Sequence, residues 1–215
     1  MRELRRYTSG ERLADALIHV AGLLAALAGC AVLMVLASRL DGTRPAWALV
    51  PYVAGLIAML GCSALYNLTS TGPRKALLRR LDHAAIFVMI AGTYTPVILL
   101  AIGGTWGRQL LVAVWVGAAS GVALKLLAPH RFERAAIAAY LLLGWAILFA
   151  LDPLLAALPA RDLGLLLAGG LLYSGGVVIH LSSRLPYHTA LWHALVVAAA
   201  ACHYVVVFHL VGTAS

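Results

Sequence analysis

Leu81-Asp82-His83-Ala84-Ala85-Ile86-Phe87 opens an apolar run that continues through Ala91-Gly92-Thr93-Tyr94-Thr95-Pro96. The run, 83–102, is long enough to cross the roughly 30 Å hydrocarbon core of a bilayer as one helix. An acid and a histidine stand at its start, and an acid at the centre of a membrane helix costs roughly 2.5–3.5 kcal/mol on insertion. Such residues mark functional sites by default, whereas a carboxylate at a helix start can serve simply as an N-cap. The stretch therefore predicts a membrane span with a candidate site at one end.

The composition of the chain agrees with a membrane protein. Hydrophobic residues make up 63% of the 215 residues and charged residues 11%, against about 45–50% and about 25% in soluble proteins. Helices are the expected spans, because lipid offers no hydrogen bonds to bare backbone. We expect an all-α bundle of seven transmembrane helices in a single domain, 1–215, with spans near 15–38, 46–68, 83–102, 109–128, 135–155, 163–183 and 189–211.

Glycines inside these runs suit close helix contacts, because small residues let backbones approach one another. The glycines in question are Gly55, Gly61, Gly117, Gly121, Gly169, Gly170, Gly175 and Gly176.

Basic residues predict the orientation. Twelve lie at the N-terminus and in the second, fourth and sixth loops, namely Arg2, Arg5, Arg6, Arg12, Arg74, Lys75, Arg79, Arg80, Lys125, Arg131, Arg134 and Arg184. Only four, Arg39, Arg44, Arg108 and Arg161, lie on the opposite side. The positive-inside rule therefore places the N-terminus in the cytoplasm and the C-terminus outside. No basic segment is interleaved with exposed aromatic residues, so we expect no nucleic-acid partner and take membrane lipid as the solvent and candidate substrate.

Polar side chains gather at the predicted cytoplasmic end of the spans. Asp15 and His19 are four residues apart, as are Ser63 and Asn67, so the members of each pair share one helix face. Imidazole and carboxylate groups are zinc ligands, and an acid beside an open coordination position can serve as a general base for water. The set comprises Asp15, His19, Ser63, Asn67, Asp82, His83, His180, His188 and His193.

Helix geometry constrains the histidines of the last span. His188 and His193 point about 140° apart in a regular helix. They could share one metal ion only if the helix begins after His188 or is locally distorted, and Pro186 just upstream favours a late start. His19 taken alone is more typical of a hydrogen-bonding residue at a helix contact than of a ligand. His203 lies about 15 Å beyond His193, and we expect it to form a hydrogen bond between helices.

Two other classes of seven-helix protein are set aside. A retinal protein needs a lysine in its last span, and the two lysines of this chain are Lys75 and Lys125. An ion-coupled transporter is expected to show acids or broken helices at mid-membrane. Asp152 is the one further candidate acid, and Pro153 places it at the outer end of its span.

The chain resembles the hemolysin III family, the bacterial branch of the progestin and adipoQ receptor proteins, a wider group that includes the alkaline ceramidases. The matching stretches fall in order in six of the seven segments. The combination of LDHAAIF and AGTYTP is the most specific of them. They are ERLADALIHVAG at 11–22, SALY at 63–66, LDHAAIF at 81–87, AGTYTP at 91–96, YLLLGW at 140–145, GGLLYSG at 169–175 and LWH at 191–193.

The resemblance implies a seven-helix protein of the bacterial inner membrane with a zinc site near the cytoplasmic face. In the family, the ligands are one histidine in segment 2 and two histidines four residues apart in segment 7, while a serine and an aspartate hold the zinc-bound water. On this sequence the serine corresponds to Ser63, the aspartate to Asp82 and the second segment-7 histidine to His193.

Two positions depart from the family pattern. Asn67 and Thr189 stand where the other two histidines are expected, and amide and hydroxyl oxygens are poorer zinc ligands than imidazole. Either the chain uses a rearranged site or it has lost tight zinc binding. The candidate metal ligands are His193, His188 and Asn67, with His19 or His83 as further members of a rearranged site.

Two functions follow from these residues. The first is a zinc-dependent hydrolase of a lipid amide at the cytoplasmic leaflet, with Asp82 as general base and Ser63 orienting the water, as the ceramidase resemblance implies. The alternative is a non-enzymatic membrane protein with a degenerate zinc site, either a pore-forming cytolysin or a membrane-homeostasis factor. A pore needs a continuous polar path, and the outer halves of the spans are nearly all apolar.

Overall fold

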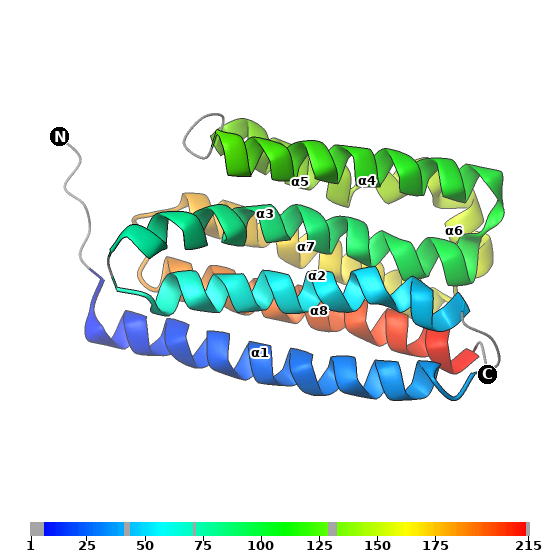
Figure 1. Ribbon diagram of the computed structural model, residues 1–215, viewed down its shortest axis with the longest axis horizontal. Coiled ribbons are helices and arrows are strands. Elements are labelled where there is room, and N and C mark those ends of the chain that lie inside the picture. The colour runs from blue at the N-terminus through cyan, green and yellow to red at the C-terminus, as the bar shows by residue number, and fades with distance from the viewer. Residues whose placement is uncertain (1–6, 41–43, 71, 129–132, 214–215) are drawn as a thin grey trace.

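The computed structural model describes residues 7–40, 44–70, 72–128 and 133–213, and all regular structure in these ranges is helical. Seven helical segments are long and apolar enough to cross a membrane, which confirms the predicted architecture. The first helix begins and the last helix ends at opposite ends of the bundle (Figure 1), as seven antiparallel spans require. Four of the basic residues that predict the orientation, Arg2, Arg5, Arg6 and Arg131, lie outside the described residues.

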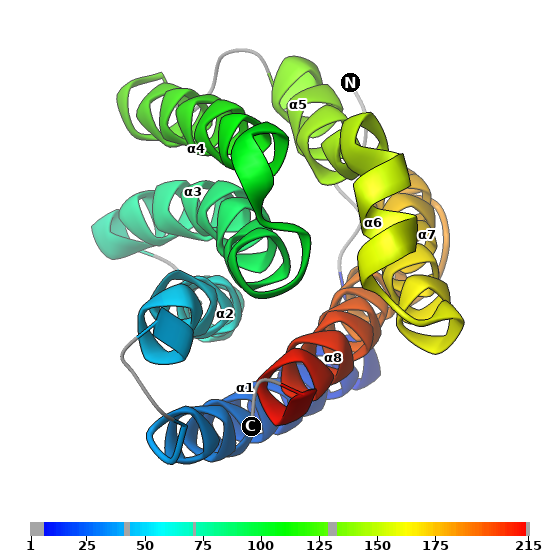
Figure 2. The same ribbon diagram turned by 90° about the vertical axis from the view of Figure 1, so that its right-hand side faces the viewer.

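The helices follow one another around an open ring when the bundle is viewed end on (Figure 2). Helices α2 and α8 both neighbour α1, and α3 packs between α2 and α4. The end of the bundle at which α1 begins is termed the inner end and is the predicted cytoplasmic one. The elements are α1 (Ser9–Ala37), α2 (Arg44–Leu68), α3 (Pro73–Pro96), η1 (Val97–Ile102), α4 (Gly104–Leu127), α5 (Glu133–Gly144), η2 (Ala146–Ala150), α6 (Leu151–Ala157), α7 (Ala160–Leu181) and α8 (His188–Thr213).

Helices α1 and α3 extend beyond the apolar runs at the inner end. The Thr8 hydroxyl accepts a hydrogen bond from the Glu11 amide at 3.2 Å, and the Glu11 carboxylate accepts one from the Thr8 amide at 2.8 Å. This reciprocal capping box starts α1 well before the apolar residues begin. Helix α3 starts at Pro73, which follows its N-cap Gly72. Asp82 therefore lies inside α3 and is not its N-cap, so the simple capping interpretation is wrong.

The fifth span is broken between α5 and η2, and Tyr94 of α3 supports the break. The Tyr94 hydroxyl accepts a hydrogen bond from the Ile147 amide at 2.7 Å and donates toward the carbonyl oxygens of Leu143 and Gly144, at 2.9 and 3.0 Å. Backbone groups freed in a membrane span need partners within the protein. The polar Thr-Tyr-Thr-Pro step thus supports the bundle: its tyrosine bonds to the break, and its threonine hydroxyls bond to carbonyls one turn earlier in α3.

Glycines bring α2 and α3 into close contact. A Cβ atom on Gly92 would lie 2.6 Å from the carbonyl oxygen of Pro51, and one on Gly55 would lie 3.0 Å from the Cα atom of Met89 in α3. Six of the eight glycines predicted at contacts have a neighbouring residue within 3.4 Å of such a Cβ position. For Gly61 and Gly175 the prediction is wrong, because a Cβ atom added at either position would meet no neighbouring residue within 4 Å.

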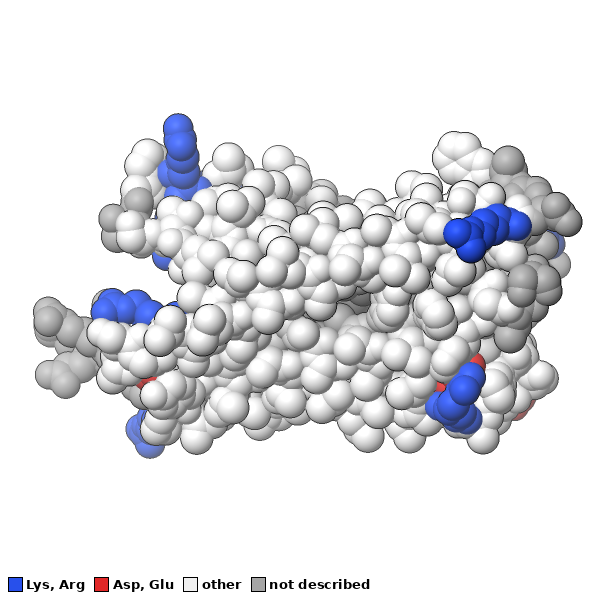
Figure 3. All heavy atoms as spheres, turned by 90° about the horizontal axis from the view of Figure 1, so that it is seen from below, with Lys and Arg blue, Asp and Glu red and all other residues white. Residues whose placement is uncertain are grey.

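Apolar side chains fill the rest of the bundle. The largest core lies between α1, α2, α3 and α8, where Leu33, Leu49 and Tyr52 are completely buried. A second apolar cluster closes the outer end, and its buried members are Val97, Leu154, Leu158, Val206 and Leu210. Charged side chains lie at the two ends of the face shown in Figure 3 and leave an uncharged middle, as a membrane-spanning bundle requires.

Candidate metal site at the inner end of the bundle

Asp15 and His19 of α1 meet His193 of α8 near the inner end. The Nδ1 atom of His193 lies 2.6 Å from Oδ1 of Asp15, and the Nε2 atom of His19 lies 3.6 Å from Oδ2 of the same carboxylate. The two imidazole rings are 4.2 Å apart between centroids. One ligand-type atom from each of the three residues lies within 4.8 Å of the other two. These three residues are termed the Asp-His-His triad.

Local contacts set the register of α1 against α8. Glu11 caps α1 with one carboxylate oxygen and accepts a hydrogen bond from the Tyr187 amide with the other, at 2.9 Å. Tyr187 has a φ angle of 57° and stands directly before α8. Further along, Gly22 allows a close approach, since a Cβ atom there would lie 2.8 Å from Val197. These contacts hold His193 level with the acid and histidine of α1.

The chemistry of the triad suits zinc. The Nε2 atom of His19 is buried and has no hydrogen-bond partner among the described residues, because 3.6 Å to Asp15 is too long for a hydrogen bond. Buried polar atoms are normally paired, and an imidazole nitrogen with a free lone pair is a metal donor. Two imidazoles and a carboxylate form a zinc-type donor set that leaves a coordination position open. The residues present therefore fit the metal that the resemblance implies.

His188 and Thr189 lie apart from the triad. Helix α8 begins at His188, whose Nε2 atom faces the Tyr7 hydroxyl at 3.3 Å, and the Thr189 hydroxyl donates to the same Tyr7 oxygen at 3.1 Å. The Nδ1 atom of His188 is buried without a hydrogen-bond partner among the described residues. His188 and His193 thus have different partners, and His188 is not part of the cluster.

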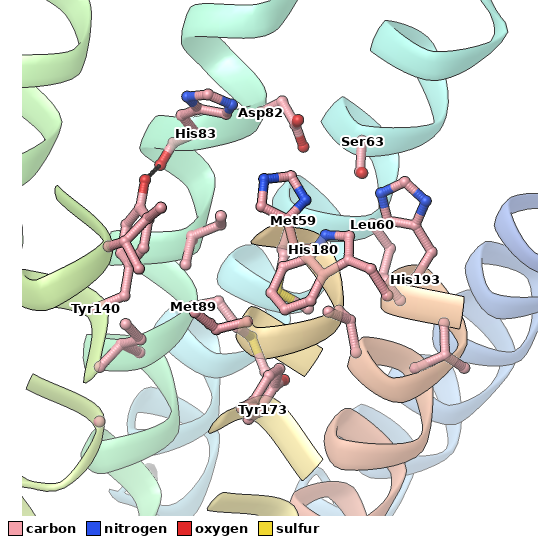
Figure 4. Close-up of a pocket in the computed structure, with 18 of the residues that line it drawn as sticks. Met59, Leu60, Ser63, Asp82, His83, Met89, Tyr140, Tyr173, His180 and His193 are labelled. Atoms are coloured by element: carbon pink, nitrogen blue, oxygen red, sulfur yellow. Dashed lines mark hydrogen bonds between the residues drawn. The ribbon is translucent and has the colours of Figure 1, made fainter. Parts of the chain in front are cut away.

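The predicted catalytic residues Asp82 and Ser63 face the same space as His193 (Figure 4). The Asp82 carboxylate has the Ser63 hydroxyl and His19 as its polar neighbours. Asn67 also lines this space, but its amide donates a hydrogen bond to the Ser63 carbonyl oxygen at 2.9 Å. The structure therefore brings together a carboxylate, a hydroxyl and two imidazoles from α1, α2, α3 and α8.

His19 and His193 of the triad line a cavity of about 420 Å³ inside the bundle. Its acid, lysine and arginine side chains lie at the inner end, whereas apolar residues such as Met59, Met89 and Val196 line it farther in, together with Tyr173 and His203. Tyr173 lies at the bottom of the view in Figure 4, with Asp82 and Ser63 at the top. The Nε2 atom of His203 lies 3.4 Å from a carbonyl oxygen of α7, which confirms the predicted bond between helices. A cavity with charged side chains at one end and a mainly apolar lining beyond them suits an amphiphilic ligand.

Two acids have roles that the sequence did not reveal. Asp15 is visible as a partner of His19 four residues on, but its contact with His193 spans 178 positions. At the outer end, Asp162 is 2% exposed and its Oδ1 atom lies 2.7 Å from Nδ1 of His209. This second pair joins α7 to α8, and no spacing in the sequence indicates it.

Comparison with known proteins covers almost the whole bundle. A model of the family described as "Haemolysin-III related" matches residues 10–204. The "Hemolysin-3 homolog" of Bacillus subtilis (strain 168) is 35% identical over 210 residues, covering 95% of this chain and 97% of that protein. "Hemolysin-3" of Bacillus cereus is 33% identical over 206 residues, covering 95% and 94%. The human "Monocyte to macrophage differentiation factor" is 27% identical over 205 residues, covering 92% and 83%.

Proposed function

This chain belongs to the haemolysin-III related family, and we propose that it hydrolyses an amide bond of a membrane lipid with a zinc ion held by Asp15, His19 and His193. One observation carries the proposal: three zinc-type ligands converge with Asp82 and Ser63 beside a cavity inside the bundle. The reacting carbonyl group of the lipid would lie beside the polar side chains at the inner end of the cavity. Its acyl chain would lie in the mainly apolar part beyond them.

The residues at the inner end divide the chemistry between them. Zinc bound by this donor set supplies a Lewis acid that polarises a carbonyl oxygen and makes water more acidic. Asp82 acts as the general base: it takes a proton from the attacking water and returns it to the amide nitrogen as the C–N bond breaks. Ser63 orients the water through its hydroxyl group. Asp15 fixes the ring orientation of His193 through the 2.6 Å contact.

Elemental analysis of the purified protein tests the metal site directly. We expect about one zinc ion per chain, because one donor set of this type holds one ion. Asp15→Asn and His193→Gln should each lower the zinc affinity by more than the roughly 10–100-fold that loss of a partner behind a ligand costs. The matched controls are Asp162→Asn and His209→Gln, which alter the acid–histidine pair at the outer end. Metal-free wild-type protein after zinc supplementation would contradict the proposal.

A second variant separates a working site from a vestigial one. Asn67→His with Thr189→His restores the two histidines that the family resemblance expects. Zinc in the wild type and in this double variant supports the Asp-His-His triad as the native site. Zinc only in the double variant would make the native site vestigial and favour a non-enzymatic role.

A further inference from the structure

Lys125 is a basic residue enclosed within the bundle. It lies in the last turn of α4 and is only 2% exposed. Its side chain has no hydrogen bond or ion pair with any residue that the structure describes. Basic residues inside membrane bundles face a cavity and pair with an opposite charge or with carbonyl groups. Lys125 lines the same cavity as the triad histidines, and the Glu133 carboxylate acts on its ammonium group electrostatically but forms no ion pair with it in the described part of the chain.

Other ionisable groups of the cavity surround Lys125. Arg79 of α3 forms an ion pair with Glu133 of α5, so the carboxylate nearest to this region already has a basic partner. Lys125, Arg79, Glu133 and His180 all lie within electrostatic range of His83. Two cations against one carboxylate leave this part of the cavity with a net positive charge. We term Arg79, His83 and Lys125 the basic subsite.

The positive-inside rule does not account for the basic subsite. That rule is satisfied by basic side chains in contact with headgroups and solvent. At the same end of the bundle Arg74, Arg134 and Arg184 are exposed and meet this requirement. Lys125 is buried instead. Nearby, the Tyr140 hydroxyl donates a hydrogen bond to the His83 carbonyl oxygen at 3.0 Å, which holds this turn of α3 against α5.

We propose that Arg79, His83 and Lys125 bind an anionic phosphate or carboxylate group at the inner end of the cavity. Charge-assisted hydrogen bonds from lysine and arginine are the strongest contacts available to such groups. Basic pockets between membrane helices on the cytoplasmic side bind lipid headgroups. The apolar lining beyond the subsite suits the acyl chain of an anionic amphiphile. Anion binding at this subsite does not require the metal. If the chain is the proposed hydrolase, the subsite selects substrates with an anionic headgroup, and that part of the inference rests on the proposed function.

Native mass spectrometry of the full chain in detergent, titrated with phosphatidic acid or phosphatidylcholine, tests the basic subsite. The wild type should bind phosphatidic acid on the order of tenfold more tightly than phosphatidylcholine. Lys125→Met should lose this preference, and Lys125→Arg should keep most of it. Methionine is apolar and similar in length, so replacing the buried charge should leave the fold intact. The matched control is Lys75→Met, because Lys75 bonds to the Thr69 carbonyl oxygen and does not line the cavity.

Inorganic phosphate identifies the source of the anion. Displacement of phosphatidic acid only at phosphate concentrations far above that of the lipid supports a lipid headgroup as the ligand. If inorganic phosphate binds as tightly as phosphatidic acid, and if this binding requires Lys125, the subsite is supported and its ligand is a free anion. Equal phosphatidic acid affinities in the wild type and Lys125→Met would overturn the proposal. Zinc content is measured on the same samples: metal-free wild type that still prefers phosphatidic acid would leave the subsite standing, so a failure of the metal site remains distinguishable.

Discussion

At the scale of single residues, Asp15 links the two histidines of the triad. One oxygen contacts His193 at 2.6 Å and the other lies 3.6 Å from His19. A carboxylate between two imidazoles can orient both rings and also donate to a metal. Asp82 has a different environment, with the Ser63 hydroxyl as its neighbour and the cavity beside it. Two acids at the same level of the bundle thus suit two tasks, ligand and base.

Asp82→Asn tests this division of labour. Asparagine keeps the shape of the side chain but cannot accept a proton from water, so the rate of lipid amide hydrolysis should fall by about 10²–10⁴-fold. The zinc content should stay unchanged, since Asp82 is outside the triad. Release of fatty acid from a fluorescent N-acyl lipid measures the rate. The control is Asp152→Asn, an exposed acid of the fifth span. A variant at position 82 with the wild-type rate would exclude Asp82 as the base.

At the scale of the helices, α3 organises the bundle. It packs against α2 through Gly92, supports the broken fifth span through Tyr94, and presents Asp82 to the cavity. The three positions use different chemistry: an absent side chain, a hydroxyl that both donates and accepts, and a carboxylate. Each depends on the others, because a shift of α3 against α2 or α5 would also move Asp82.

Gly92→Ala should destabilise the contact between α2 and α3. The new Cβ atom would lie 2.6 Å from the Pro51 carbonyl oxygen, and relieving such overpacking costs about 1–3 kcal/mol. We expect a lower midpoint of thermal unfolding in detergent. Gly61→Ala is the matched control, because its Cβ atom would meet nothing within 4 Å; it should be neutral or slightly stabilising. Equal midpoints for the two variants would contradict this account of the contact.

At the scale of the whole molecule, the two ends of the bundle differ. The inner end holds the triad, Asp82 and the basic subsite beside a cavity. The outer end is closed by the apolar cluster around Val206, which is completely buried. A channel needs a path of polar groups or water from one side to the other, and the described core at the outer end provides none. The architecture therefore favours a site open to one side.

Reconstitution into liposomes tests the absence of a pore. The two Bacillus relatives carry the name hemolysin, so lysis is the natural alternative to examine. Purified protein should release no more of an encapsulated dye than empty liposomes do, even at a high protein-to-lipid ratio. The apolar outer cluster is the physical reason. Release that rises with the amount of protein would favour the cytolytic alternative.

The sequence by itself determined the seven spans, their antiparallel order and the end at which the polar residues gather. These follow from local quantities: the length of each apolar run, the charge of the loops and the i,i+4 spacing of Asp15 and His19. The choice of Ser63, Asp82 and His193 came from matching motifs to a family, and the structure brings all three to one cavity.

Only the tertiary structure decided which polar residues meet. The partnership of Asp15 with His193, the separation of His188 from the triad and the inward turn of Lys125 depend on how each helix is rotated against its neighbours. That rotation is set by many weak packing contacts, such as Gly22 against Val197. In a chain this rich in apolar residues almost every helix face could be buried, so the hydrophobic pattern alone does not select the buried one.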